Sequence, residues 1–400
     1  MPNQAVPSRT SAWILLVFVY YIAAAASFGG FFTKWHFRDN TRFSLPLVLD
    51  GTVERPFVYR QLLPATANLI DSVIPQKAKR AFLDKLVERP PLSNPIQRYF
   101  PGATDATDPQ YALRYFLVYG MTFASLFAAL FVLRAVCIEV VGDRVAATLT
   151  PVVIAAMLPL IMTEGGYFYD MPELLFMALG TWLTLKRRPV ALAAVVALAT
   201  LNKESYLLFV LALYPFIAMR YSRKWSLLLT AVLLAIAAAV NIALKYRYLG
   251  NTGGMMVYLL GEHVRFLLNP RNYFRTEINY GVPTTKGFNV IHLLLIGILV
   301  KTGWRRLPLV TRQQAWIAAV INAPLFIAFC FNDELRNLSL LMMPFSFLVC
   351  ATLSSVLLQA LSQPSSQDRP IVGLRQRDPI ATPLTTAESP LTYAPPSKSN

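Results

Sequence analysis

From Pro189 to Met219 the chain reads PVALAAVVALATLNKESYLLFVLALYPFIAM, an apolar run interrupted by the polar residues NKES at 202–205. These residues place Lys203 directly beside Glu204. Taking a charge out of water costs several kcal/mol before a partner offsets it. Charges inside such a run therefore indicate a place where they are paired or face a water-filled cavity.

The whole chain has the composition of a membrane protein. Of its 400 residues, 55% are hydrophobic and only 14% are charged, which excludes an ordinary soluble domain. Apolar stretches long enough to cross a hydrocarbon core of roughly 30 Å recur along it. They lie at 12–30, 115–133, 145–162, 167–185, 225–244, 287–301, 313–331 and 338–361. We predict an all-α, polytopic transmembrane protein with about 10 membrane segments, including a short hairpin.

Basic clusters in short loops predict the orientation of these segments. KRR at 186–188, the cluster at 220–224 and the cluster at 301–306 all belong inside by the positive-inside rule. Both termini are then cytoplasmic, and the loops 31–114 and 245–286 are extracytoplasmic. Region 189–219 has cytoplasmic ends, so it forms either a hairpin of two short helices or two tilted spans. Both alternatives place NKES towards the outer face.

The domain organisation follows from this orientation. Residues 1–361 form the transmembrane domain, and the polar, proline-rich residues 362–400 form a disordered cytoplasmic tail. We interpret the N-terminal apolar run as an uncleaved first span, although a cleaved signal peptide has a similar pattern. Within loop 31–114, TANLIDSVIP and AKRAFLDKLVER have the apolar spacing of amphipathic helices that lie on the membrane surface.

Polar residues that are not simple basic anchors gather on the outer side, which predicts one outward-facing site. Asp170 equally suits the start of a helix, where a carboxylate favours the positive end of the helix dipole, and Tyr59 and Arg60 equally suit headgroup anchors. The candidate residues are Asp39, Asp50, Glu54, Tyr59, Arg60, Tyr169, Asp170, Lys203, Glu204, Glu334 and Arg336.

The charge balance indicates the chemistry of the ligand. The net charge is +16, and basic residues outnumber acidic ones in both outer loops. In a membrane protein this favours anionic headgroups or phosphates over nucleic acid as partners. The three cysteines and three histidines show no metal-ligand spacing and no disulfide framework.

Four short segments, PFVYRQLLP, YDMPELLF, NKES and ELRN, resemble segments of poorly characterised bacterial membrane glycosyltransferases of the GT-C superfamily. The resemblance covers about residues 12–361 as architecture. It implies a sugar donor linked to polyprenyl phosphate, a glycan or lipid acceptor, a role in the cell envelope and a place in the bacterial inner membrane. The first acid after the first span is Asp39, in HFRDN, and it is not part of an acidic pair, which departs from the superfamily's pattern.

The resemblance also implies roles for individual residues. A carboxylate has to take the proton of the acceptor hydroxyl, with Asp39 as the first choice and Asp50 as the second. Asp170 binds a sugar. Lys203, Arg60 and Arg336 stabilise the leaving lipid phosphate, and Glu204 orients Lys203 as part of a buried phosphate clamp. The other substrate-binding candidates are Glu54, Tyr59, Tyr169 and Glu334. No cofactor is required, and a divalent cation is compatible with the site.

Three other classes of protein fit parts of the pattern. A transporter or flippase of a lipid-linked or anionic solute would use the hairpin as a discontinuous element. An oligosaccharide polymerase also has large outer loops with arginines. A non-catalytic subunit of a membrane complex would tolerate Asp39→Asn and Lys203→Ala.

Overall fold

The computed structural model describes residues 9–34, 44–88, 95–100, 103–161, 166–254, 258–279 and 281–362. The chain divides into two units, Met1–Leu358 and Gln359–Asn400. Asp39 lies outside the described residues, and so does the expected tail from residue 363 onward. The fold and the site described below lie in the first unit.

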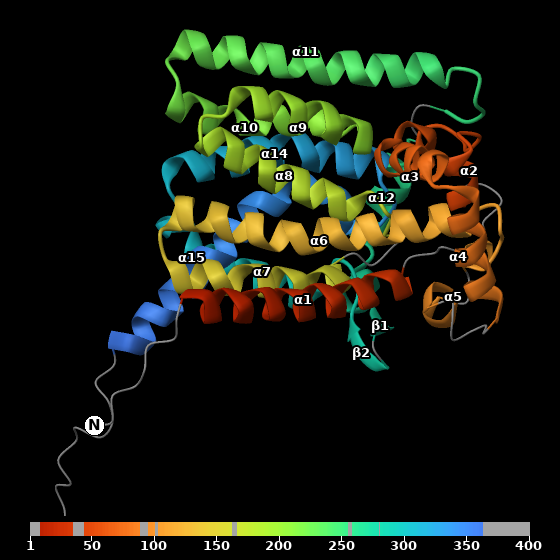
Figure 1. The fold of residues 1–400 in the computed structure, drawn as a ribbon. Coiled ribbons are helices and arrows are strands. Elements are labelled where there is room, and N and C mark those ends of the chain that lie inside the picture. The colour runs from red at the N-terminus through yellow and green to blue at the C-terminus, as the bar shows by residue number, and fades with distance from the viewer. Residues whose placement is uncertain are drawn as a thin grey trace, which may run out of the picture. The chain divides into compact units, whose positions relative to one another are not determined.

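Long helices run side by side through the first unit (Figure 1). They correspond to the apolar segments expected from the sequence, with small differences at their ends. Their bounds are α1 Arg9–Lys34, α6 Ala112–Val141, α7 Arg144–Ile161, α8 Asp170–Leu185, α9 Pro189–Asn202, α10 Tyr206–Arg220, α11 Arg223–Arg247, α13 Val290–Gly303, α14 Leu309–Phe329 and α15 Met342–Ser362.

The long helix α6 organises the packing. It contacts α1, α7 and α8, and α8 in turn contacts α9 and α10. Helix α10 continues the contacts to α11 and α14. Apolar side chains from these helices form one buried core. This core holds α8 and the α9–α10 turn against each other, which positions the site.

Several long apolar helices fit a multi-pass membrane protein. Among the described residues, four helical segments are long and apolar enough to cross a bilayer: Thr10–Gly30, Ala112–Val141, Arg223–Arg247 and Leu335–Ala360. Their outward faces carry large exposed apolar side chains such as Trp13, Leu227 and Val356. Exposed apolar surface of this extent is typical of helices that face lipid rather than water.

The region 189–219 forms two helices joined by a turn, a geometry common to both arrangements expected from the sequence. Helix α9 has 14 residues and helix α10 has 15, which corresponds to about 21–23 Å at about 1.5 Å per residue. Pro189 begins α9, where its missing N–H costs nothing. The turn between the helices is made by Lys203, Glu204 and Ser205.

Short elements cover one end of the helical bundle (Figure 1). They include the 3₁₀ turns η1 Phe57–Tyr59 and η2 Thr104–Ala106, and the helices α2 Leu45–Leu49, α3 Leu62–Val73, α4 Gln76–Glu88 and α5 Pro95–Tyr99. Helices α3 and α4 overlap the segments predicted as surface helices, and each begins a few residues earlier. Helix α12 Leu260–Leu268 and the turn η3 Pro270–Phe274 come from the second large loop.

The second large loop also contains two strands, which the all-helical prediction missed. Strands β1 Thr276–Asn279 and β2 Val282–Thr285 pair antiparallel, with Thr276 opposite Thr285. Gly281, in the turn between them, has a φ of 78°, a conformation that glycine adopts without steric cost. The strands are too short for the alternating pattern to stand out in the sequence.

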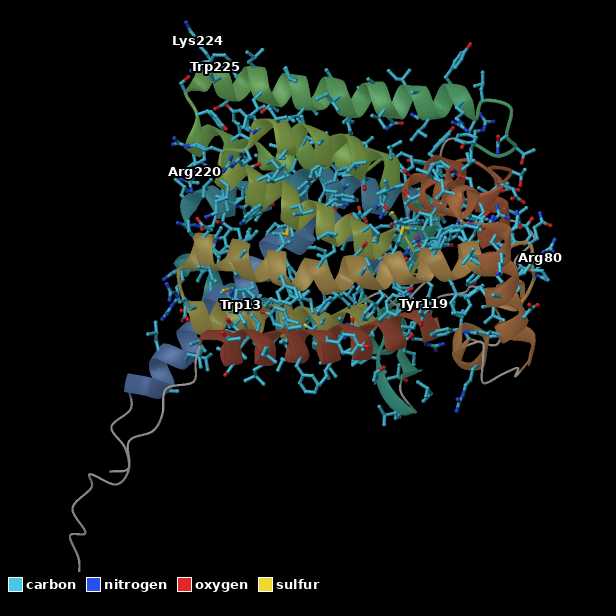
Figure 2. All side chains as sticks on the ribbon, viewed as in Figure 1. Trp13, Arg80, Tyr119, Arg220, Lys224 and Trp225 are labelled. Atoms are coloured by element: carbon cyan, nitrogen blue, oxygen red, sulfur yellow. The ribbon has the colours of Figure 1, made fainter. Side chains whose placement is uncertain are left out.

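The basic clusters lie at the other end of the bundle. Figure 2 shows Arg220 and Lys224 at one end and Arg80, on α4, at the opposite end. The turn η4 Trp304–Arg306, which carries Arg305 and Arg306, follows α13. The last short element, η5 Leu335–Leu341, leads directly into α15.

Candidate functional site

In the α9–α10 turn, the side chains of Lys203 and Glu204 point in different directions. Helix α9 ends at Asn202, and Lys203 has extended backbone angles, φ −159° and ψ 132°. Successive side chains point to opposite sides of extended backbone. Accordingly, Lys203 bonds to Glu173 at 2.7 Å, whereas Glu204 bonds to Arg60 at 3.1 Å. The expected clamp of Lys203 oriented by Glu204 is therefore wrong, because each residue has a different partner.

The first turn of α8 supplies the two carboxylates that face Lys203. Asp170 begins this helix, and Glu173 follows three positions later on the same face. The Lys203 Nζ atom lies 2.7 Å from Glu173 Oε2 and 3.7 Å from Asp170 Oδ1. All three side chains are nearly inaccessible, with exposed fractions of 6%, 4% and 2% for Lys203, Glu173 and Asp170. These charges depend on one another, since water cannot stabilise them.

Arg336 joins this group from η5. Its Nη1 atom lies 3.4 Å from Asp170 Oδ1 and 3.4 Å from the Tyr169 hydroxyl. Its Nη2 atom forms a short ion pair with Glu334 Oε1. The Asn337 amide donates to the second oxygen of Glu334 at 2.9 Å. Arg336 and Glu334, which the sequence placed in one outer loop, therefore act as one unit next to Asp170.

Arg60 enters from the third direction, directly after η1. Its guanidinium carbon lies 4.2 Å from the centre of the Tyr169 ring, and its Nη1 atom forms a short hydrogen bond to the Tyr169 hydroxyl. The Tyr169 ring stacks on Tyr167 with centroids 5.3 Å apart, and Arg336 lies 4.6 Å from the Tyr167 ring centre. The two arginines and the two tyrosines thus stack on one another in alternating aromatic and cationic contacts.

Glu173 is the residue that sequence reasoning missed. Its Oε1 atom accepts hydrogen bonds from Ser205 at 2.7 Å and from Ser339 at 2.8 Å. With Lys203 on its other oxygen, Glu173 ties α8 to the α9–α10 turn and to η5. A signal was available, because PELLF carries a lone acid on an otherwise apolar helix, three positions after Asp170.

The cluster has no excess positive charge. Four carboxylates meet three cations in it, and every cation already has at least one carboxylate partner. A buried charge without a partner is strongly unfavourable, so this pairing explains why the group is stable at an inaccessible place. We call this set the ionic cluster, and its members are Arg60, Asp170, Glu173, Lys203, Glu204, Glu334 and Arg336.

Asp50 lies outside the ionic cluster. It accepts a hydrogen bond from the Tyr111 hydroxyl at 2.5 Å and lies 3.6 Å from Arg114. This contact raises the pKa of Tyr111, chiefly because the neutral hydroxyl donates to the carboxylate. Asp50 thus links the end of α2 to the start of α6.

The other described residues of the predicted set, Tyr59 and Glu54, also lie outside the ionic cluster. Tyr59, the last residue of η1, is buried in the core. Glu54 is half-buried, and the neighbouring Arg55 amide donates to the Thr252 carbonyl at 2.9 Å. Asp39, the first choice for the base, lies outside the described residues. The structure therefore brings together Arg60, Tyr169, Asp170, Lys203, Glu204, Glu334 and Arg336 from the predicted set.

Metal ligation finds no support in the described part of the chain, where no group of three or more His, Cys, Asp or Glu side chains could hold an ion. His263 is buried against Phe326, with ring centroids 4.9 Å apart. His292 bonds to Thr285 and to the Gly287 carbonyl. Both histidines therefore pack against or hydrogen-bond to neighbouring parts of the fold.

Comparison of the chain with protein-family models, with curated proteins and with solved structures finds no match. The fold and the site define a class of protein in physical terms. It is a helical protein that fits a multi-pass membrane arrangement, with a buried ionic cluster at one end of its helices. Its function is therefore argued from the geometry of that cluster.

Proposed function

We propose that the protein is a membrane glycosyltransferase of the GT-C type. In this proposal it transfers a sugar from polyprenyl phosphate to a glycan or lipid acceptor on the extracytoplasmic face of a bacterial inner membrane. About 10 helical segments cross or enter the bilayer, and both termini are cytoplasmic. Helices α3 and α4 lie on the outer membrane surface.

The single observation that carries the proposal is the one-sided convergence of charge. The ionic cluster is built from four segments that are far apart in the sequence: the residue after η1, the start of α8, the α9–α10 turn and η5. The basic clusters that mark a cytoplasmic side follow the other ends of α8 and α10 (Figure 2). A lipid-linked substrate whose reactive head lies at the outer face requires this arrangement.

The ionic cluster offers the groups that glycosyl transfer needs. Carboxylates accept a proton or hold sugar hydroxyls, cations stabilise the leaving phosphate, and the stacked Tyr167 and Tyr169 hold the two arginines in position. The Nε atom of Arg60 is buried and has no hydrogen-bond partner. An unused buried donor is costly in the resting protein, and a phosphate oxygen would satisfy it.

The charge balance sets how a phosphate binds. Because the cations already have carboxylate partners, an anion binds at a donor that these partners leave unused. Glu204 is the most accessible of the four carboxylates in these pairs, with 35% of its side chain exposed, whereas Glu334 has 12% exposed. We therefore propose that the donor phosphate binds Arg60 next to Glu204, at the unpartnered Nε atom, while Glu204 keeps its bond to Nη2. Lys203 and Arg336 contribute further positive electrostatic potential near the bound phosphate.

A carrier of lipid-linked or anionic solutes is the second candidate function. The observation that favours it is the α9–α10 hairpin, because paired short helices with a polar turn occur where transporters bind their solutes. A carrier exposes its site alternately to both sides, however, and the ionic cluster lies at one end only. Movement of labelled lipid between leaflets without any transfer of sugar would identify this function.

Activity in membranes from cells that express the chain tests the proposal. Wild type is compared with Lys203→Ala, Arg336→Ala and Lys186→Ala, using radiolabelled polyprenyl-phosphate sugars. Lys186 is the matched control, since it forms an ion pair with Glu139 that is partly exposed and joins the other ends of α6 and α8. We expect transfer by wild type and Lys186→Ala, and a loss of at least about 100-fold in the two cluster variants. If both cluster variants still transfer sugar, the ionic cluster is not the site of transfer.

A further inference from the structure

The four carboxylates of the ionic cluster differ in how fully their oxygens are used. Asp170 accepts from the Tyr167 amide through Oδ2 at 2.7 Å and faces Lys203 and Arg336 through Oδ1. Glu173 uses both of its oxygens. Asp170 and Glu173 are thereby held in fixed positions, and a carboxylate whose two oxygens both have partners is called saturated here.

The other two carboxylates come from loops. Glu334 is also saturated, since Arg336 takes Oε1 and Asn337 takes Oε2. Glu204 is different. Its Oε1 atom accepts from Arg60 at 3.1 Å, but its Oε2 atom is buried and has no hydrogen-bond partner. Among the carboxylates of the ionic cluster, Glu204 therefore has the unused acceptor atom.

Glu204 also has the most exposed side chain of the four carboxylates, although its Oε2 atom is itself buried. Its side chain is 35% exposed, compared with 2% for Asp170 and 4% for Glu173. It lies in the turn between α9 and α10, at the end of the bundle where the outer loops gather. Its partner Arg60 is 10% exposed and is fixed over the Tyr169 ring, so one oxygen of Glu204 is positioned while the other is free.

We propose that Glu204, rather than one of the saturated carboxylates, binds the acceptor hydroxyl and takes its proton. This inference rests on the proposed glycosyl transfer and assigns the base for that reaction. The hydroxyl donates to Oε2 of Glu204. As its oxygen forms a bond to the anomeric carbon, its proton passes to Oε2. The bond between that carbon and the phosphate oxygen breaks, and the electron pair leaves with the polyprenyl phosphate, beside Arg60.

The test is transfer by purified full-length protein carrying Glu204→Gln. The amide keeps an oxygen for Arg60 but cannot take a proton, so we expect kcat to fall by about 10²–10⁴-fold. The KM for the donor should change by less than about threefold, because the donor does not need the base. Glu139→Gln is the matched control, since it makes the same change in an ion pair at the opposite end. We expect its kcat to stay within about twofold of wild type.

A second variant covers the case in which Glu204→Gln does not fold. In Glu204→Ala, added formate can occupy the vacated space and supply a carboxylate. We expect formate to raise transfer by Glu204→Ala at least about tenfold and to leave Glu204→Gln unchanged, because a base worth about 10²–10⁴-fold is being replaced. A structural role for Glu204 would not produce this rescue.

The outcomes separate the inference from the function it rests on. Full transfer by folded Glu204→Gln, or no rescue of Glu204→Ala by formate, would overturn the role of Glu204 while leaving the glycosyltransferase in place. No transfer by wild type from any donor would overturn the proposed function itself, and the role of Glu204 with it.

Discussion

Arg60 and Glu204 are 144 positions apart in the sequence, yet their side chains form an ion pair at 3.1 Å. The pair joins the end of η1, in the first large loop, to the turn between α9 and α10. It also places Arg60 over Tyr169, at the start of α8. Three segments that are distant in the sequence therefore meet at this ion pair. Substitution of single residues tests what each contributes to stability and activity.

Removal of Lys203 should strongly destabilise the protein. Lys203→Ala leaves Glu173 and Asp170 buried without their shared cation, and breaking a buried pair in this way costs about 3–5 kcal/mol. Lys186→Ala removes a partly exposed partner of Glu139 and should cost at most about 1 kcal/mol. Unfolding in detergent solution measures both variants. Equal effects of the two substitutions would mean that the buried pairs do not hold the fold.

Much of the helical framework could be predicted from the sequence, because it depends on local properties. Apolar stretches and basic loops are visible in one pass, and the helices α6 to α11 follow them closely. The short strands β1 and β2 were missed, since four residues carry too little pattern. Among the described residues, membrane crossing is supported most directly for the four segments that are both long and apolar enough to span a bilayer.

The candidate site was predictable in its members but not in its pairing. Lys203 and Glu204 are neighbours in the sequence, which suggested a pair, but the extended backbone at Lys203 separates their side chains. Glu173 was missed because its partners Lys203, Ser205 and Ser339 lie 30, 32 and 166 positions away. Contacts at such separations depend on the packing of α8, which no local pattern encodes.

The close contact between α8 and α10 depends on Gly180. A Cβ atom there would collide with the Tyr206 hydroxyl, which donates to the Phe176 carbonyl at 2.9 Å. We expect Gly180→Ala to cost about 1–3 kcal/mol of stability. Tyr206→Phe should recover part of this loss in the double variant, because the colliding oxygen is removed.

Gly120 provides the control for that experiment. It also lies within a long helix, but nothing lies within 4 Å of the place where its Cβ would be. Gly120→Ala should therefore be neutral or stabilising by up to about 1 kcal/mol. Thermal unfolding of all four variants gives the comparison. A loss at Gly120 as large as at Gly180 would point to backbone effects rather than to the contact with Tyr206.

Asp143, in the loop between α6 and α7, should make the stability of the protein depend on pH. Its Oδ1 atom accepts from the amides of Val145 and Ala146 at the start of α7. The pKa of Asp143 lies below its ordinary value because the Ala146 amide, and then the Ser354 hydroxyl, donate to the ionised form. The ionised form is therefore favoured by folding. Its contribution is complete above the unfolded pKa of about 3.9 and is lost as the pH falls through the folded value.

Comparison of Asp143→Asn with Asp143→Ala separates the effect of the carboxylate charge from the effect of the N-cap of α7. Asp143→Ala should cost about 0.5–2 kcal/mol at pH 7, because the helix loses its cap. Asp143→Asn keeps an acceptor oxygen, so its deficit relative to wild type should be smaller and should disappear as the pH falls below about 3.9. Unfolding measured between pH 7 and pH 3 checks this. A deficit of Asp143→Asn that grows at low pH would contradict the direction of the pKa shift.

The proposed orientation predicts which end of the bundle faces outward. Arg80→Cys, on α4, should react in intact cells with a maleimide that does not cross membranes. Lys224→Cys, at the start of α11, should react only after the cells are opened. Both positions are exposed and lie at opposite ends (Figure 2). The unsubstituted protein is the control, since Cys137 and Cys350 are buried and Cys330 is partly buried. The reverse pattern would place the ionic cluster on the cytoplasmic side.

Consumption of the donor by the purified wild-type protein tests the central claim most directly. The protein is reconstituted in lipid vesicles with a panel of radiolabelled polyprenyl-phosphate sugars and with envelope glycans or lipids as acceptors. The account predicts that, for at least one donor, labelled product and free polyprenyl phosphate appear in equal amounts. If no donor is consumed while the protein shows a cooperative unfolding transition, the ionic cluster is not a glycosyl-transfer site.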